Sequence, residues 1–321
     1  AIDSLHAWFM HNSPEHHLFR TNDGGVSWEQ LMITAGYYFR DLSFISPEKG
    51  WAIVHHFETN SNKMLMTADG GETWDTLADI AGGLNVFGLQ FRSETHGWFL
   101  AFNEGIYRTQ DGGVTWELCL SGGAYIGQAF FIDAQRGWVP TLGSDPEFSI
   151  LFSTVDGGTS WIADTLGNYG FGSIYFLDEE RGWFVRDDKI LRTVNGGAAW
   201  TETTVPGAFG LSRVVFIDSL TGWTYDNTLE ETSYMLISTD GGVTWEKDHA
   251  ASKTGYFYDM DFDDSGTGWL VGSSGKILKR SPKDLLTDIT APESGMPKKA
   301  FLHAFPNPFS SELAIVLPTA A

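Results

Sequence analysis

The 321-residue sequence holds a single cysteine, Cys119, so no internal disulfide can form. It also has no apolar run near the roughly 18 residues that a membrane-spanning helix needs. Basic residues are scarce, because 20 Lys and Arg stand against 41 Asp and Glu. The resulting net charge of −21 repels phosphate backbones and anionic membranes. These absences exclude a disulfide scaffold and argue against binding to nucleic acid or insertion into a membrane.

Glycine, by contrast, is abundant, and much of it lies in one short pattern that recurs six times. The copies are TNDGGVSW (21–28), TADGGETW (67–74), TQDGGVTW (109–116), TVDGGTSW (154–161), TVNGGAAW (193–200) and the shorter TDGGVTW (239–245). Glycine supplies the positive φ of a tight hairpin, and an Asp carboxylate can accept hydrogen bonds from N–H groups of its own turn. We therefore predict a structural role for Asp23, Asp69, Asp111, Asp156, Asn195 and Asp240. Asn at one copy fits a turn and not a charged catalyst.

A second repeat interlocks with the first. Gly-Trp pairs end at Trp51, Trp98, Trp138, Trp183, Trp223 and Trp269, spaced 40 to 47 residues apart. Each Trp is preceded by a Phe seven residues earlier and, in most copies, by Asp or Ser five residues earlier. The opening AIDSLHAW matches FIDSLTGW (216–223), which makes Trp8 a seventh copy with Asp3 in the place of Asp218. The chain thus starts inside a repeat, and we expect an N-terminal truncation.

Each repeat can be written as four short strands, with the DGG turn between the third and fourth strands. Four antiparallel strands at a period near 43 residues are typical of one propeller blade. The sequence predicts an all-β fold, a seven-bladed β-propeller over residues 1–283, with six or eight blades as alternatives. The last unit lacks the DGG turn, so a strand from the other terminus is expected to complete it.

The Ser/Thr-x-Asp-x-Gly-x-Thr/Ser-Trp turn resembles the Asp box, or BNR repeat, of sialidases, xyloglucan hydrolases and sortilin-type receptors. Together with the Gly-Trp and Ile-x-Arg-Thr elements, residues 1–281 look most like the photosystem II assembly factor family of seven-bladed BNR propellers. The resemblance implies the fold. It also implies that the boxes are structural, because in those families they sit away from the active sites. It does not by itself imply an activity.

Three classes of function stay open. The one we favour is a non-catalytic binding or scaffolding propeller for a glycan or protein ligand. The alternatives are a polysaccharide-active glycoside hydrolase and an assembly factor for a membrane complex. The sialidase Arg-Ile-Pro motif is absent, and box acids spaced around a rim do not suit paired catalysis. Acids outside the repeat are expected to be solvated or turn-forming; they are Asp41, Asp145, Asp187, Asp259 and Asp261.

Neither the histidines nor the cysteine predicts a cofactor. Loops of the first two units carry His11, His16, His17, His55 and His56, which could approach one another around a transition metal. Neighbouring residues of a strand point to opposite faces, so at most one His of each adjacent pair could ligate. We expect surface histidines and no metal. Cys119 lies where other copies carry Leu31 and Leu77, which predicts a small packing residue.

The end of the chain differs in composition. Residues 284–300 are rich in Pro, Ser and Lys and are predicted to be a linker. Residues 301–321 contain FPNPF (305–309) followed by alternating apolar residues, which resembles the start of a type A C-terminal sorting domain of the type IX secretion system. Only the beginning of such a domain is present. The resemblance implies a secreted or cell-surface protein of a Bacteroidetes-like bacterium, with the secretion machinery as a partner.

The repeat also predicts where a ligand would bind. The box turns and the turns before Gly-Trp are expected at one end of the blades. The loops between strands two and three, and between successive units, share the other end. Those loops vary in length and carry aromatic residues. We predict that five of them gather as a binding site: Tyr38, Tyr125, Tyr169, Phe209 and Tyr256.

Overall fold

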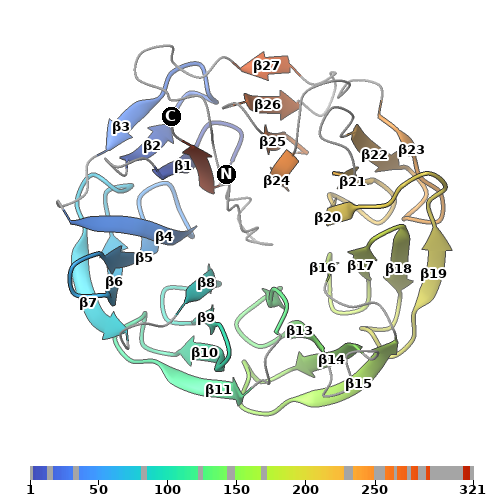
Figure 1. Cartoon of the computed structure of the whole chain (residues 1–321), viewed down its shortest axis with the longest axis horizontal. Coiled ribbons are helices and arrows are strands. Elements are labelled where there is room, and N and C mark those ends of the chain that lie inside the picture. The colour runs from blue at the N-terminus through green and yellow to red at the C-terminus, as the bar shows by residue number, and fades with distance from the viewer. Residues whose placement is uncertain are drawn as a thin grey trace. The chain divides into compact units, whose positions relative to one another are not determined.

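A computed structural model describes residues 3–12, 17–31, 36–80, 85–121, 126–142, 149–167, 172–227, 234–248, 257–263, 266–272, 276–280, 287–289 and 314–318. The described residues form strands and turns, without a helix. None of them therefore lies in a helix long and apolar enough to cross a membrane. The strands make seven four-stranded sheets, and the fold is the all-β, seven-bladed β-propeller that the repeats predicted (Figure 1).

The first two sheets have the following strands. The order β28-β1-β2-β3 joins β28 (Ala314–Pro318), β1 (Ala7–Asn12), β2 (His17–Thr21) and β3 (Glu29–Leu31). The order β4-β5-β6-β7 joins β4 (Tyr37–Phe44), β5 (Gly50–His56), β6 (Ser61–Thr67) and β7 (Asp75–Ile80). Within each repeat, strands that follow one another along the chain pair in antiparallel fashion.

The other five sheets repeat this pattern. The third joins β8 (Val86–Phe91), β9 (Gly97–Ala101), β10 (Gly105–Thr109) and β11 (Glu117–Ser121). The fourth joins β12 (Phe130–Phe131), β13 (Gly137–Leu142), β14 (Ser149–Thr154) and β15 (Ile162–Gly167). The fifth joins β16 (Ser173–Phe176), β17 (Gly182–Arg186), β18 (Lys189–Thr193) and β19 (Thr201–Thr204). The sixth joins β20 (Leu211–Phe216), β21 (Gly222–Asp226), β22 (Tyr234–Ser238) and β23 (Glu246–Lys247). The seventh joins β24 (Phe257–Phe262), β25 (Gly268–Gly272), β26 (Lys276–Arg280) and β27 (Thr287–Ile289).

The chain divides into two compact units. The first comprises Ala1–Trp98, Thr109–Trp116 and Phe257–Ala321. The second comprises Phe99–Arg108 and Glu117–Tyr256. The contacts described below each lie inside one unit.

The Phe and Gly-Trp repeats are explained by packing between neighbouring sheets. In the first unit the buried Trp51 stacks on Phe91 of the following sheet, with ring centroids 3.9 Å apart. Its indole N–H donates to the carbonyl of Gly112, in that sheet's box, over 2.8 Å. The glycine of each Gly-Trp pair leaves room for the Phe of its own sheet, because a Cβ on Gly50, for example, would meet the Phe44 ring. The same stacking joins Trp8 to Phe44, Trp138 to Phe176 and Trp183 to Phe216.

The two kinds of turn share one end of each sheet, as predicted. The box N–H of Gly70 donates to the carbonyl of Glu48, in the turn before Trp51, over 2.7 Å. The equivalent bond joins Gly157 to Gln135, also over 2.7 Å, in the second unit. The turn before each Trp is itself capped, since Asp3 accepts the N–H groups of Leu5 and His6 just as Asp218 does those of Leu220 and Thr221. The strand 2–3 loops that the structure describes, such as residues 57–60 and 102–104, therefore lie at the opposite end, as does the described connection between sheets at residues 205–210.

The first and last sheets differ from the prediction. The seventh sheet takes its fourth strand, β27, from the residues that follow β26, so completion of that sheet by the other terminus was wrong. It is the first sheet that gains a distant strand, because β28 pairs with β1 in parallel, with Trp8 opposite Ala314 (Figure 1, dark red beside blue). The strands β27 and β28 lie within 284–300 and 301–321 respectively.

A lysine links the same two sheets within the first unit. Lys279 of β26 donates to the carbonyls of Ser4 and Gly24, each over 2.9 Å. Gly24 belongs to the first Asp box. In other boxes the equivalent glycine carbonyl accepts the indole N–H of a Trp, as Gly112 does from Trp51, whereas the Gly24 carbonyl accepts the Lys279 ammonium. The Lys279 ammonium also lies 4.8 Å from the ring centroid of Trp269. Burial lowers the pKa of Lys279, and the bound carbonyls compensate in part for the lost hydration.

Candidate functional site

The loop end of the second sheet carries a pocket of about 480 Å³. Its lining comes from the start of β4, the end of β5 with the following loop and the start of β6, and the end of β7: Tyr37, His56, Thr59, Ser61, Lys63, Asp79 and Ile80. These segments are the variable loops from which the sequence predicted binding. Of the residues around this pocket, Tyr38 was predicted from the sequence as a site residue, whereas Tyr37, Lys63 and Asp79 were not named.

The aromatic wall of this pocket is held by a glycine. Tyr37 lies opposite His56 in the β4–β5 ladder, and their rings meet edge to face with centroids 4.6 Å apart. Gly36 has φ = 90°, and a Cβ there would lie 3.0 Å from His56 Nε2. Gly36 also accepts the N–H of Phe57 over 3.3 Å. The glycine thus allows both the turn and the close approach of the imidazole.

The polar side of the pocket fixes the imidazole. His56 Nδ1 accepts the backbone N–H of Thr59 over 3.3 Å and lies 3.1 Å from its hydroxyl. Because an N–H group can only donate, the neutral ring carries its proton on Nε2. Lys63 donates to Asp79 over 2.9 Å, and this hydrogen bond raises the pKa of Lys63. A partly exposed pair of this kind contributes little stability, and the Asp79 side chain is 78% exposed.

A second aromatic group lies on the other side of the same strands. Tyr38 packs against Phe57 and His55, with ring centroids 4.6 and 5.1 Å away. The guanidinium of Arg40 lies 5.5 Å from the Tyr38 centroid. Phe57 is 58% exposed, which is unusual for a ring of that size in a well-packed sheet. His55 was expected at the surface, and this was wrong: it is buried, and its Nδ1 lies 2.7 Å from Asn62 Oδ1, so the two adjacent histidines have separate partners.

The five predicted aromatic site residues have different outcomes. Tyr38 is part of the group just described, in the first unit. Phe209 belongs to the second unit; its ring is 69% exposed and its N–H donates to Asp226 over 3.1 Å. Tyr125, Tyr169 and Tyr256 lie outside the described residues. Their predicted gathering around one site stays a prediction.

The Asp boxes have the geometry of structural turns. Asp111 accepts the hydroxyl of Thr109 over 2.8 Å, and the N–H and hydroxyl of Thr115 over 2.9 and 2.6 Å. The Thr109 hydroxyl in turn accepts the N–H of Gly113 over 2.9 Å. The same bonds surround Asp23, Asp69, Asp156 and Asp240. Ser238 supplies the first hydroxyl of the last box, which is therefore a complete copy and not a shorter one.

The divergent box shows what the carboxylate does. Asn195 keeps the bonds from the Thr193 hydroxyl and the Ala199 N–H, both at 2.9 Å. Ala199 has no hydroxyl to donate to a second oxygen, and Asn195 has no second oxygen to accept one. The hydrogen-bond donor and its acceptor are lost together, as expected for a structural turn whose polar groups pair with each other, and not for a reacting group.

The intact boxes hold a charged carboxylate. Hydrogen bonds from the Ser27 hydroxyl and N–H lower the pKa of Asp23 to about 2.

The acids outside the repeat were predicted to be solvated or turn-forming, and this was wrong for Asp41, Asp259 and Asp261, which are buried. Asp41 is fully buried and accepts the N–H groups of Leu42 and Leu89, each over 2.8 Å. Asp259 and Asp261 are buried, Asp187 is exposed beside Arg186, and Asp145 lies outside the described residues. Burial raises the pKa of the Cys119 thiol to about 12, so it is no nucleophile at neutral pH. Among the residues that the structure describes, no group of three His, Cys, Asp or Glu is arranged to hold a metal ion.

Fold and loops together define the class: a seven-bladed propeller of Asp-box repeats with a pocket on its loop end. The BNR/Asp-box repeat model matches residues 236–247. The photosystem II assembly lipoprotein Ycf48 of Trichormus variabilis, and that of a Nostoc species, are 39% identical over 59 residues. This match spans 18% of the present chain and 17% of each relative.

Solved structures cover far more of the chain. A structure titled YCF48 bound to D1 peptide aligns with a TM-score of 0.67 at 22% identity, covering 88% of this chain and 91% of that one. YCF48 from Cyanidioschyzon merolae gives 0.66 at 20% identity, covering 88% and 98%. A xyloglucanase from Xanthomonas campestris gives 0.62 at 13% identity, covering 90% and 55%. At these identities the likeness shows the fold alone.

Proposed function

We propose that the protein is a non-catalytic binding propeller whose loop pocket takes a segment of a protein partner. The observation that carries this proposal is the pocket of about 480 Å³ between Tyr37, His56 and Lys63, with exposed Phe57 on the same loop. Aromatic side chains that present a large rigid surface are the usual anchors of protein interfaces. At the opposite end, the Asp-box carboxylates already accept hydrogen bonds within their own turns.

The charge of the chain indicates the chemistry of the partner. A net charge of −21 attracts basic segments and repels acidic ones over about 10 Å at moderate salt. The similar structure bound to a D1 peptide supports a peptide ligand in preference to a glycan. A basic segment can place one apolar residue against Tyr37 and another against Phe57, on the other side of the strands, while Asp79 attracts its cations. The nearby Lys63 then limits how many cations the pocket itself accepts.

A peptide array tests this proposal. The protein is applied to arrayed 15-residue peptides without arginine, whose charge is graded by lysine content, and, in parallel, to a glycan array. We expect binding to basic peptides that contain an apolar residue, and loss of that binding in Tyr37→Ala and Phe57→Ala. The matched control is Val114→Ala, because Val114 is an exposed apolar residue at the box end. Binding to glycans only, or peptide binding that survives both loop substitutions, contradicts the proposal.

We also propose that the chain is exported and acts at the cell surface. The support is the FPNPF segment at 305–309, which lies outside the described residues. Fusion of residues 301–321 to a reporter, in a host with type IX secretion, tests it. Export that stops when Pro306 and Asn307 are changed to Ala supports the proposal. Export that continues unchanged after these substitutions contradicts the proposal.

A further inference from the structure

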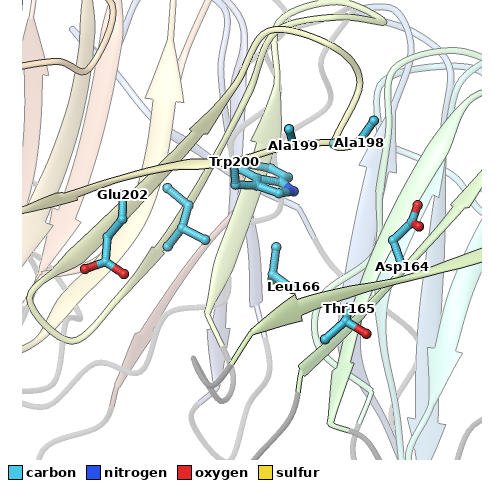
Figure 2. Close-up of a pocket in the computed structure, with 9 residues that line it drawn as sticks. Asp164, Thr165, Leu166, Ala198, Ala199, Trp200 and Glu202 are labelled. Carbon is cyan, nitrogen blue, oxygen red and sulfur yellow. The ribbon is translucent and has the colours of Figure 1, made fainter.

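A second pocket, of about 230 Å³, lies in the second unit between the fourth and fifth sheets, at the end that carries the boxes. Figure 2 shows Trp200 at its centre, with Asp164 on β15 across from the divergent box. Apolar walls come from Leu166, Leu191 and the box alanines. This site is independent of the loop pocket and of the proposed function.

Three departures from the repeat make this pocket. Asp164 stands three residues after Trp161, where the corresponding residues of the first three sheets pack on the next sheet's box. Leu31 lies 3.2 Å from the Cβ position of Gly71, and the Cys119 sulfur 3.2 Å from that of Gly158. Here a carboxylate takes the place of that packing residue, beside Gly197.

The second departure is in the box. The two residues before its Trp are Ala198 and Ala199, whereas every other copy has a Val, Glu or Thr followed by Ser or Thr. The box of the second sheet, for example, has Glu72 and Thr73 in these places. The shorter side chains open the space beside Trp200 that Figure 2 shows.

The third departure is a missing arginine. At the junction of the first and second sheets, Arg20 donates to the box carbonyl of Asp69 over 3.1 Å and to Glu72 over 2.9 Å. At the junction of the third and fourth sheets, Arg108 donates to Thr159 of the box over 2.6 Å. The same ladder position in β14 is Ser153, which lies opposite Ile162 as Arg20 lies opposite Glu29. No described arginine covers this box at that position, and the second and sixth sheets likewise have Met66 and Ile237 in place of the arginine.

Two polar groups in this pocket are left for a ligand. The Asp164 side chain is exposed and makes no hydrogen bond or ion pair with any described residue. The Trp200 indole N–H also donates to no described residue, although Trp74 and Trp116 donate to Gly71 and Gly113 over 3.1 Å. The ring of Trp200 packs edge to face on Phe176, which holds it in place.

We infer that this pocket binds an arginine side chain of a partner protein. The guanidinium pairs with Asp164 and stacks on Trp200, the aliphatic stem lies on Leu166 and the alanines, and the indole N–H donates to a carbonyl of the bound segment. The incoming residue restores what Arg20 and Arg108 do elsewhere in the chain. The volume of about 230 Å³ suits one side chain and not an extended ligand.

Titration of the full chain with N-acetyl-arginine amide tests this inference. The indole signal of Trp200, assigned by its loss in Trp200→Phe, is followed by NMR. We expect it to shift with the arginine compound and not with the uncharged N-acetyl-citrulline amide. Asp164→Asn is expected to weaken binding about tenfold, since it removes the charge of the carboxylate partner.

A rebuilt junction provides the decisive control. Ser153→Arg with Ala198→Glu recreates the Arg20–Glu72 pair, so the chain's own guanidinium is expected to fill the site and abolish binding without lowering the melting temperature. Asp164→Leu is the second variant, should the double substitution fold poorly, and it is also expected to abolish binding. No shift of Trp200, an equal shift with citrulline, or full binding by the folded rebuilt protein or by Asp164→Leu overturns the inference.

Discussion

Substitution of the box carboxylate Asp111 separates architecture from function most clearly. Asp111→Ala removes an acceptor of three hydrogen bonds, from the Thr109 hydroxyl and from the N–H and hydroxyl of Thr115. Water can replace part of these bonds, because the turn is exposed. We expect a loss of about 1–2 kcal/mol in the free energy of unfolding, with ligand binding unchanged.

The divergent box indicates how the loss divides. In Asp111→Asn the amide oxygen can keep the two bonds that Asn195 keeps, so we expect the loss to be less than about 1 kcal/mol. Thr115→Ala added to Asp111→Asn reproduces the Asn195–Ala199 pair and is expected to cost less than the sum of the single changes. An additive result means that the Asp111 and Thr115 side chains do not act as a pair.

Urea unfolding, followed by tryptophan fluorescence and by circular dichroism, measures these differences. Coincident transitions are required, because repeat proteins can lose cooperativity. An Asp111→Ala protein with unchanged unfolding but no ligand binding would refute the structural role of the box. Equal losses for Asp111→Ala and Asp111→Asn would refute the hydrogen-bond account.

Three further predictions concern packing, the link between first and last sheets, and pH. Gly50→Ala is expected to destabilise by about 1–3 kcal/mol, because its Cβ would meet the Phe44 ring; thermal unfolding equal to wild type contradicts this. Lys279→Met is expected to cost about 1–3 kcal/mol by leaving the carbonyls of Ser4 and Gly24 without their donor; denaturant unfolding checks it, and an unchanged midpoint speaks against this link. The pKa values of Asp23 and Asp156 are lowered to about 2 by hydrogen bonds from Ser27 and Ser160, so their contribution is complete above about pH 4 and is lost as the pH falls towards 2. Stability measured by urea unfolding at stepped pH follows this, and a curve flat from pH 5 to 2 would show that the box carboxylates contribute nothing.

Much of the fold could be predicted from the sequence, because the repeat imposes the same contacts many times. Phe44, for example, packs over Gly50 of its own sheet and against Trp8 of the preceding sheet. Because each of the three residues needs the other two, they recur together in the sequence. The parallel strand β28 could not be predicted, since pairing across some 300 residues leaves no local pattern. Strand β27 was missed because no Asp-box turn precedes it.

Pockets were harder to predict than strands. The loop segments around Tyr37 and His56 were identified by their variability, yet the volume between them depends on side-chain packing across four strands. The pocket at Trp200 depends on substitutions at Ser153, Asp164 and Ala198, which lie on different strands or turns. Each alone is unremarkable in sequence, and only the fold brings them to one junction.

The most direct test of the central claim is the affinity of one basic peptide, selected on the array, for wild type, Phe57→Ala and Val114→Ala proteins by calorimetry. Both substitutions remove an exposed apolar side chain, at the loop end and the box end respectively, so stability should stay within about 0.5 kcal/mol. The account predicts that Phe57→Ala weakens binding at least about tenfold and that Val114→Ala leaves it unchanged. Weakening by Val114→Ala with Phe57→Ala unaffected would place the binding surface at the box end and contradict the account.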